Sequence, residues 1–547
     1  MSTQPINPDI NYLQSAALRN WLTDDEEIAV IDVREQGVIS RDGYLLKSVS
    51  LPLSHLEIRA EELLPRKNVR LVIVDETGGE YAHRAGWTLS ALGYSQLSLL
   101  QGGARQWQAD GGELFTGTSA LSKGFGEYVE AHYATPHLSA QELNQRINAG
   151  ENILIVDGRT LKEFQDFSLP GGVACPNAEL VYRVPGLLTS ADRPVVVNCA
   201  GRTRSIIGAQ TLINAGLKNP VWALENGTMD WLAAGYELQH DVDNVAPVPP
   251  GSSPALDEAL KLSASLVAKY QLQEIDQQRL ARYQRESHSR ALYLLDVRTR
   301  DEYVAGHLPG ARWAAGGELV QGVDRFVGIQ NARVVLVDDH HGIRAATAAS
   351  WLSQLQWAEV FYLRVSAEEA TETGFAADPD DFDDIKSIQP AELQSLPSAT
   401  VIDLASSPLY ELGHLPGAWF AVRARLNGGI NALPATGPIV LTSPDGHLAS
   451  YAARDLATVT QREIFVLNGG TDEWVRQGFA LETGAARLWS ATDDVWRSAY
   501  HQQGDERLAA FQAYLSWETG LVEQIERDGG VNFALGPVAT PEGDWLK

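Results

Sequence analysis

The chain has 547 residues, of which 44% are hydrophobic and 21% are charged. This length and composition predict a globular protein of about three to five domains and exclude a disordered or fibrous chain. The formal net charge of −27 argues against general binding to nucleic acid or to an anionic membrane surface.

The N-terminal segment MSTQPINPDINYLQ has neither the basic region nor the apolar core of a secretory signal. The sequence contains no run of about 18 apolar residues, which is the length that would predict a membrane-spanning helix. The chain has only 2 cysteines, too few for a disulfide framework, which agrees with a reducing compartment. We therefore expect a cytoplasmic protein that binds neither membrane nor nucleic acid.

An apolar strand that ends in aspartate recurs along the chain. The segments are IAVID ending at Asp32, ILIVD ending at Asp157, YLLD ending at Asp296 and TVID ending at Asp403. An arginine stands two residues after the first three aspartates, at Arg34, Arg159 and Arg298, whereas Ala405 takes this place in the last segment. This recurrence predicts a chain of four repeats.

Each aspartate segment is followed by a turn with proline, a second apolar strand and a helical segment. The second strands are RLVIVD, PVVVN, RVVLVD and PIVLT. A glycine turn and a tryptophan then follow in all repeats but the third, at Trp107, Trp231 and Trp474. Short, fully apolar strands that alternate with helices predict an α/β fold, with a parallel sheet covered by helices on both faces in each repeat.

We place the repeats at residues 1–122, 130–245, 255–378 and 385–485. The segment DVDNVAPVPPGSSP has the composition of a linker. A helical insert over residues 256–288 accounts for the long spacing before Asp296. The tail, residues 488–547, carries a helical pattern that belongs to no repeat, and we expect it to pack against a neighbouring domain.

The second repeat carries a cysteine where its second strand gives way to a helix. The loop reads Cys199-Ala-Gly-Arg-Thr-Arg204, and the helix begins near Ser205. Ligands of parallel sheets bind beyond the carboxyl ends of the strands. A helix N-terminus and two arginines favour the thiolate, which is the nucleophilic form of cysteine. The loop is therefore predicted to cradle an anionic sulfur or an oxyanion.

Spacing from the preceding aspartate indicates which residues stand at the corresponding place in the other repeats. These are Glu76, Asp339 and Ser443, and none of them is a thiol. We therefore interpret the second repeat as the working domain and the other repeats as domains that have lost the nucleophile. The adjacent His340 and His341 lack the i,i+4 spacing of a metal site, so no metal and no cofactor is expected.

Together these features resemble the rhodanese family of sulfurtransferases. The resemblance rests on Asp157 and Arg159, on Glu163 at the next helix start, on the PGG turn and on the CAGRTR loop. It covers roughly residues 20–485 and implies four tandem rhodanese-like domains. It also implies an enzyme whose Cys199 takes sulfane sulfur from a small anionic donor as a persulfide and passes it to cyanide, a thiol or a protein.

The resemblance also implies roles for residues around Cys199. The residues expected to bind substrate are Ala200, Gly201, Arg202, Thr203 and Arg204, with Arg183 as a further candidate. The backbone amides of the loop would hold the persulfide, and its two arginines would orient the donor. Asp157, Arg159 and Glu163 would support the site, the last two as an ion pair, and Cys175 is interpreted as structural.

Other functions are weighed against this one. The reactive loop of cysteine phosphatases has the pattern C-x5-R. The loop here is C-x4-R, one residue shorter, which favours binding of a single sulfur atom over phosphate or arsenate. Enzymes that use mercaptopyruvate resemble C-G-[SA]-G-V-[ST], from which CAGRTR departs, so thiosulfate or a persulfide such as glutathione persulfide is favoured as donor. A non-enzymatic scaffold or sulfur-binding sensor is the alternative from another class, although a scaffold would not need the intact loop.

Overall fold

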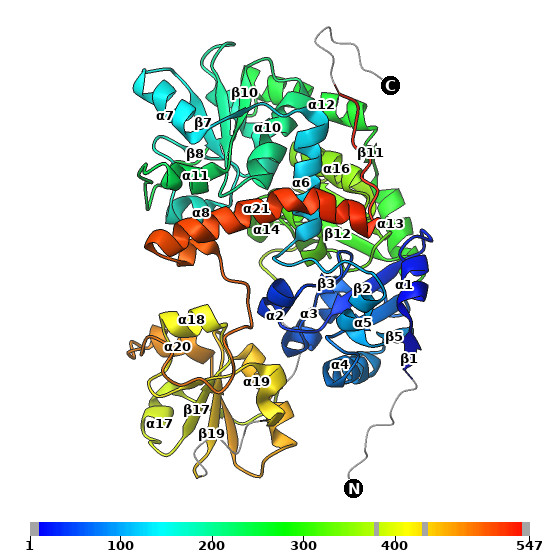
Figure 1. Ribbon diagram of the computed structural model, residues 1–547, viewed down its shortest axis with the longest axis vertical. Coiled ribbons are helices and arrows are strands. Elements are labelled where there is room, and N and C mark those ends of the chain that lie inside the picture. Colours follow the sequence, from blue (N-terminus) through cyan, green and yellow to red (C-terminus); the bar gives the residue numbers. More distant parts are fainter. Residues whose placement is uncertain (1–9, 377–381, 429–435, 539–547) are drawn as a thin grey trace.

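The computed structural model describes residues 10–376, 382–428 and 436–538 of the chain (Figure 1). The described residues form four parallel sheets of five strands each, which follow one another along the sequence and are flanked by helices. The predicted α/β fold with four tandem repeats and a helical C-terminal region is confirmed. In Figure 1 the fourth repeat, in yellow and orange, lies at the lower left, beside the first repeat in blue.

The second repeat shows the arrangement that all four share. Its strand order is β6-β10-β9-β7-β8. The elements are β6 (His137–Leu138), α7 (Ala140–Asn148), β7 (Leu154–Asp157), α8 (Leu161–Asp166), β8 (Val173–Ala174), α9 (Leu180–Leu187), β9 (Val195–Asn198), α10 (Thr203–Ala215), β10 (Val221–Leu224) and α11 (Gly227–Ala233). The central strands β7 and β9 are buried along their whole length, because helices cover both faces of the sheet.

The first repeat has the same order, β1-β5-β4-β2-β3. Its elements are β1 (Asn11–Leu13), α1 (Ser15–Trp21), β2 (Ile28–Asp32), α2 (Gln36–Asp42), β3 (Val49–Ser50), α3 (Leu56–Leu63), β4 (Arg70–Val74), α4 (Glu80–Ala91), β5 (Leu97–Leu100) and α5 (Gly103–Ala109). The hydrophobic side chains of β2 and β4 lie in the core of the repeat.

The third and fourth repeats repeat this order. The third comprises β11 (Gln273–Glu274), α13 (Gln277–Glu286), β12 (Leu292–Asp296), α14 (Arg300–Ala305), β13 (Arg312–Trp313), α15 (Gly316–Gln321), β14 (Arg333–Asp338), α16 (Ile343–Leu355) and β15 (Glu359–Arg364). The fourth comprises β16 (Ser387–Ile388), α17 (Pro390–Gln394), β17 (Thr400–Asp403), α18 (Ser407–Leu412), β18 (Trp419–Phe420), β19 (Ile439–Thr442), α19 (His447–Ala457), β20 (Ile464–Leu467) and α20 (Gly470–Arg476).

Three longer helices lie outside the sheets' repeating units. They are α6 (Ala120–Tyr133), α12 (Pro254–Tyr270) and α21 (Gly504–Asp528). The predicted helical insert over 256–288 corresponds to two helices, α12 and α13, separated by β11, which pairs with β15 in the sheet of the third repeat. The exposed, two-residue edge strand β11 carries no apolar pattern, so the sequence did not separate it from the helix before it.

The recurring aspartate and arginine form a buried ion pair in each of the first three repeats. In the second repeat Arg159 donates to both carboxylate oxygens of Asp157, at 2.9 and 2.8 Å, and to the Phe167 carbonyl oxygen beyond α8. The pair therefore ties the end of β7 to the end of the next helix. In the fourth repeat, which has Ala405 instead of arginine, burial raises the pKa of Asp403 to about 6.

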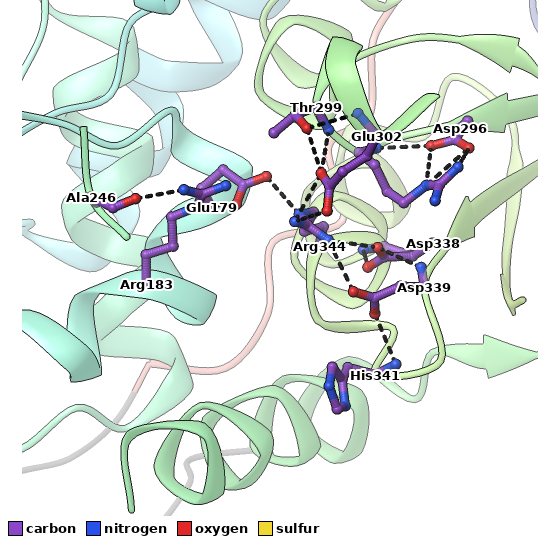
Figure 2. A network of polar contacts seen from close by, with 12 residues as sticks. Glu179, Arg183, Ala246, Asp296, Thr299, Glu302, Asp338, Asp339, His341 and Arg344 are labelled. Carbon is purple, nitrogen blue, oxygen red and sulfur yellow. Dashed lines mark hydrogen bonds and ion pairs between the residues drawn. The ribbon is translucent and has the colours of Figure 1, made fainter. Parts of the chain in front are cut away.

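A second buried arginine joins the second repeat to the third (Figure 2). Arg344, in the first turn of α16, donates to Glu302 and to Asp338 of its own repeat, at 2.9 and 3.3 Å. Its Nε also donates to Glu179 of the second repeat at 2.6 Å. Glu179 in turn accepts a hydrogen bond from Arg183. Because the Arg344 side chain is 0% exposed, the interface shields this cation from solvent among its carboxylate partners.

We predict that Arg344→Met destabilises the second and third repeats by about 3–5 kcal/mol, because it leaves buried carboxylates without their counter-charge. Urea unfolding followed by intrinsic fluorescence measures the effect. The matched control is Arg364→Met, which removes an arginine that is 48% exposed in its pair with Glu274 and should cost no more than about 1 kcal/mol. Equal unfolding midpoints for the two variants would contradict the assigned role of Arg344.

Candidate active site

Cys199 lies between the end of β9 and the start of α10, in the loop that the sequence predicts to be the site. Its residue is 2% exposed. The carbonyl oxygens of Cys199 and Ala200 accept hydrogen bonds from the backbone N–H groups of Thr228 and Met229, in the first turn of α11. Among the described residues, the backbone N–H groups of residues 200–204 donate to no backbone oxygen, so they are available to an anion.

One glycine allows α11 to approach the loop this closely. Gly227 has a φ of +54°, and a Cβ at this position would lie 2.2 Å from the Cys199 carbonyl oxygen. Any other side chain would therefore push α11 away from the loop and break the hydrogen bonds that orient its carbonyl groups.

Burial raises the pKa of the Cys199 thiol. The positive charge of Arg204 and hydrogen bonds from Ser205 act in the opposite direction, and the negative charge of Glu518 adds to the effect of burial. The expectation that the helix N-terminus and the arginines make this thiol more acidic is therefore wrong. Desolvation of the thiolate outweighs the nearby positive charge.

Arg204 and Glu163 form a two-point ion pair beside Cys199. Nη1 and Nη2 of Arg204 each donate to one oxygen of Glu163 at 2.8 Å. Burial alone would raise the pKa of Glu163, but Arg204 and hydrogen bonds from Thr160 hold it at about 2. The predicted ion pair between Arg159 and Glu163 is therefore wrong, since Arg159 is paired with Asp157.

Arg202 faces α6 and is fully engaged there. Its Nε and Nη2 donate to Glu127 at 2.8 Å, Nη2 also donates to Glu130, and Nη1 donates to the Asn226 side chain at 3.1 Å. Of the two loop arginines, only Arg204 lines the cavity described below. The structure therefore ties Arg202 to the support of the loop.

The predicted contact of Arg183 with substrate has no counterpart in the described structure. Its Nε donates to Glu179 and its Nη1 to the Ala246 carbonyl oxygen, both at 2.5 Å (Figure 2). Arg183 belongs to the network at the interface with the third repeat and is not among the residues that line the cavity. The sequence around Arg183 does not distinguish an arginine that binds substrate from one that pairs with a buried carboxylate.

The C-terminal tail covers the Cys199 loop. Tyr500 donates a hydrogen bond to the Ala200 carbonyl oxygen at 2.9 Å, and its ring stacks on Phe167 with centroids 4.7 Å apart. On α21, the Oε1 atom of Glu518 accepts hydrogen bonds from Thr203 at 2.8 Å and from Tyr514 at 3.2 Å. The expected packing of the tail against a neighbouring domain is thus on the second repeat, at the predicted site.

Helix α6 contributes a buried lysine to the same place. Figure 1 shows α21, in red, crossing α6, in cyan, beside the second repeat. Lys123 of α6 hydrogen-bonds to the hydroxyl of Tyr514 and lies 4.5 Å from the centre of that ring and 5.1 Å from the centre of the Trp517 ring. The sequence did not indicate Lys123 as a site residue, because it lies between the first and second repeats and outside their recurring motifs.

A cavity of about 920 Å³ leads to this site. Its walls come from all four repeats and from the tail. At the end near Cys199 the lining residues are Lys123, Glu163, Phe167, Ala200, Arg204, Met229, Tyr500 and Tyr514. Among the described residues, no group of three or more His, Cys, Asp or Glu side chains is arranged to hold a metal ion.

Sheet register identifies the residues that correspond to Cys199. The aspartate that ends the first strand pairs with Asn198 in the second repeat, and with Val74, Val337 and Thr442 in the others. The next residues are Asp75, Asp338 and Ser443. The spacing-based assignments of Glu76 and Asp339 are therefore wrong by one residue, whereas Ser443 is correct. In the third repeat the spacing from Asp296 to Asp338 equals that from Asp157 to Cys199, so that Asp339 lies one residue too far along the chain.

In the first and third repeats an aspartate carboxylate accepts the hydrogen bonds of the loop. Asp75 accepts from the backbone N–H groups of Thr77, Gly78, Gly79 and Ala82. Asp338 accepts from the N–H groups of Asp339 and Ala345. A fixed carboxylate thus fills the cradle in these repeats, whereas the second repeat presents a thiol there.

Comparison with known proteins identifies the first three repeats. The family model of the rhodanese-like domain matches residues 15–110, 139–234 and 277–372. The crystal structure of thiosulfate sulfurtransferase from Pseudomonas aeruginosa is similar over 96% of this chain and 99% of that chain, with a TM-score of 0.90 and 38% identity. The described residues contain no helix with the length and apolar character needed to span a bilayer.

Two curated relatives are more distant. The 3-mercaptopyruvate sulfurtransferase of Escherichia coli K12 is 25% identical over 242 residues, which cover 34% of this chain and 85% of the relative. The thiosulfate sulfurtransferase GlpE of Pseudomonas fluorescens is 27% identical over 93 residues, which cover 17% of this chain and 85% of the relative.

We predict that Glu518→Gln lowers the pKa of Cys199 and that Arg204→Met raises it, because the first change removes a nearby negative charge and the second a positive one. The pH dependence of thiol alkylation by iodoacetamide, measured in a Cys175→Ala background, reports this pKa. Glu523→Gln changes an exposed glutamate on the same helix and is the control. Shifts in the same direction for both test variants would contradict the electrostatic account.

Proposed function

Because the chain belongs to the rhodanese family of sulfurtransferases, we propose that Cys199 is its nucleophile and carries sulfane sulfur as a persulfide. The observation that carries the proposal is the Cys199 loop itself. It combines a thiol, available backbone N–H groups and Arg204 at the end of a cavity. Cys175, the other cysteine, is 0% exposed within the apolar core of the second repeat.

In the first step the Cys199 thiolate attacks the outer sulfur of thiosulfate. A bond forms between Sγ and that sulfur, the S–S bond of thiosulfate breaks, and sulfite leaves with the electron pair. The terminal sulfur of the resulting persulfide carries the negative charge. The N–H groups of residues 200–204, at the start of α10, would stabilise that charge.

In the second step a nucleophile attacks the terminal sulfur of the persulfide. Cyanide forms a C–S bond and leaves as thiocyanate, while the S–S bond breaks and its electron pair returns to Cys199 as thiolate. A thiol acceptor takes the same sulfur and leaves as a persulfide. Neither step needs a metal or an external oxidant, because the sulfur moves between nucleophiles.

Thiosulfate or a persulfide such as glutathione persulfide is the proposed donor. The departure of CAGRTR from the loop that is typical of mercaptopyruvate enzymes supports this choice. The structural similarity to a protein named thiosulfate sulfurtransferase, which extends over almost the whole chain, supports it as well. Both cysteines are free, in agreement with a reducing compartment, and we propose that the enzyme works in the cytoplasm.

A scaffold or sulfur-binding sensor built from rhodanese-like modules is the second candidate. The observation in its favour is that the residues corresponding to Cys199 in the other repeats are Asp75, Asp338 and Ser443, none of which can carry sulfur. A sensor would bind sulfur on Cys199 without turnover, whereas the enzyme releases thiocyanate continuously when both substrates are present.

We predict that Cys199→Ser lowers the rate of thiocyanate formation from thiosulfate and cyanide by at least about 10²-fold, because a hydroxyl is a far weaker nucleophile than a thiolate. The matched control is Cys175→Ala, which should leave the rate unchanged. Retention of a substantial rate in Cys199→Ser, or its loss in Cys175→Ala, would show that the nucleophile is assigned to the wrong residue. A rate confined to one turnover in the parent protein would favour the sensor.

A further inference from the structure

The arginines near the site already have carboxylate partners. Arg202 is paired with Glu127 and Glu130, and Arg204 gives both terminal nitrogens to Glu163. An anionic donor would have to compete with these carboxylates for each guanidinium. The cation that binds the donor is therefore to be sought among the other residues of the cavity.

Lys123, unlike these arginines, forms no ion pair with a carboxylate among the described residues. Its residue is 6% exposed, and across the described chain no carboxylate oxygen lies within 4.0 Å of its Nζ. Its hydrogen-bond partner is the hydroxyl of Tyr514, and the rings of Trp496, Tyr514 and Trp517 surround the ammonium group at 4.5–6.0 Å. An ammonium group has three N–H donors, so this lysine retains donors for a ligand.

Lys123 also stands on the cavity side of the site. It lines the cavity together with Ala200, which follows Cys199 in the chain, and Arg204. Tyr514 places it close to the loop, since a Cβ on Gly201 would lie 3.2 Å from that ring. The nearest carboxylate in this hydrogen-bond chain is Glu518, which accepts from Tyr514 and is not among the cavity-lining residues.

We propose that Lys123 determines donor specificity by binding the anionic group of the sulfur donor while Cys199 attacks its sulfane sulfur. The inference rests on the proposed function of Cys199. The ammonium would donate to sulfonate oxygens of thiosulfate and then to the departing sulfite. A donor without anionic oxygens next to its sulfane sulfur cannot make this contact.

The charges around Lys123 act on its ammonium group in both directions. Burial lowers the pKa of Lys123, and Arg204 and Arg325 act in the same direction, whereas Glu518 and Cys199 oppose it. A bound dianion supplies further negative charge and so favours the protonated lysine. Before the donor binds, the aromatic rings stabilise the ammonium group through cation–π contacts.

The test compares two donors in the full-length chain carrying Lys123→Met. Thiosulfate is the donor with sulfonate oxygens. Cysteamine persulfide, which has no such oxygens, whose only negative charge lies on the sulfane sulfur itself and whose amine is positively charged, is the other. We expect the KM for thiosulfate to rise about tenfold or more, because one charge-assisted contact with the donor is lost. The kcat should change little. The kcat/KM for cysteamine persulfide should not fall.

The control variant is Lys269→Met, which makes the same substitution at another lysine, one that is half-buried beside the rings of Tyr133 and Tyr270. Lys269 hydrogen-bonds to Asn214, near the end of α10 opposite to the Cys199 loop, so both donors should react as with the parent. Equal losses with both donors in Lys123→Met would indicate a structural role and overturn the inference, as would an unchanged KM for thiosulfate.

A binding measurement separates this inference from the proposed chemistry. Sulfite binding is measured by calorimetry to Cys199→Ser and to the double variant that also carries Lys123→Met. The anion contact is supported if Cys199→Ser binds sulfite and the double variant binds it at least about tenfold more weakly. This result would support the contact even if the parent protein forms no persulfide. Equal affinities, or no binding to either protein, would overturn the contact whatever the fate of the sulfur.

Discussion

The packing of α6 and α21 over the Cys199 loop is the contact on which the site depends. It buries the thiol, brings Lys123 and Tyr514 to the end of the cavity, and gives Arg202 its carboxylate partners. Thr203, inside the loop, donates to Glu518 across 315 residues of sequence. The second repeat therefore supplies the thiol, whereas segments outside the repeat control its solvation and charge.

The same helix-start positions serve two purposes in two repeats. In the second repeat Arg204 of α10 pairs with Glu163 of α8, and in the third Arg344 of α16 pairs with Glu302 of α14. The loop before Arg344 holds Asp338 instead of a thiol, and this arginine reaches across to Glu179 of the second repeat. An ion pair that borders a reactive loop in one domain thus anchors an interface in the next.

Much of the fold and the position of the nucleophile could be predicted because they depend on local patterns. Apolar strands ending in aspartate, such as that before Asp157, and the CAGRTR loop are visible in the sequence itself. The partners of the loop could not be predicted, because pairing of Arg202 with α6 or of Thr203 with Glu518 depends on how distant segments pack. The raised pKa of Cys199 follows from the same packing and reverses a prediction based on the loop alone.

The central claim is that sulfur is carried on Cys199 and on no other residue. Peptide mass mapping of the full-length protein after incubation with thiosulfate, and again after cyanide, tests it most directly. The account predicts a gain of the mass of one sulfur atom on the peptide that contains Cys199, and its complete removal by cyanide. A protein that gains no sulfur, gains it on Cys175, or keeps it in the presence of cyanide would contradict the account.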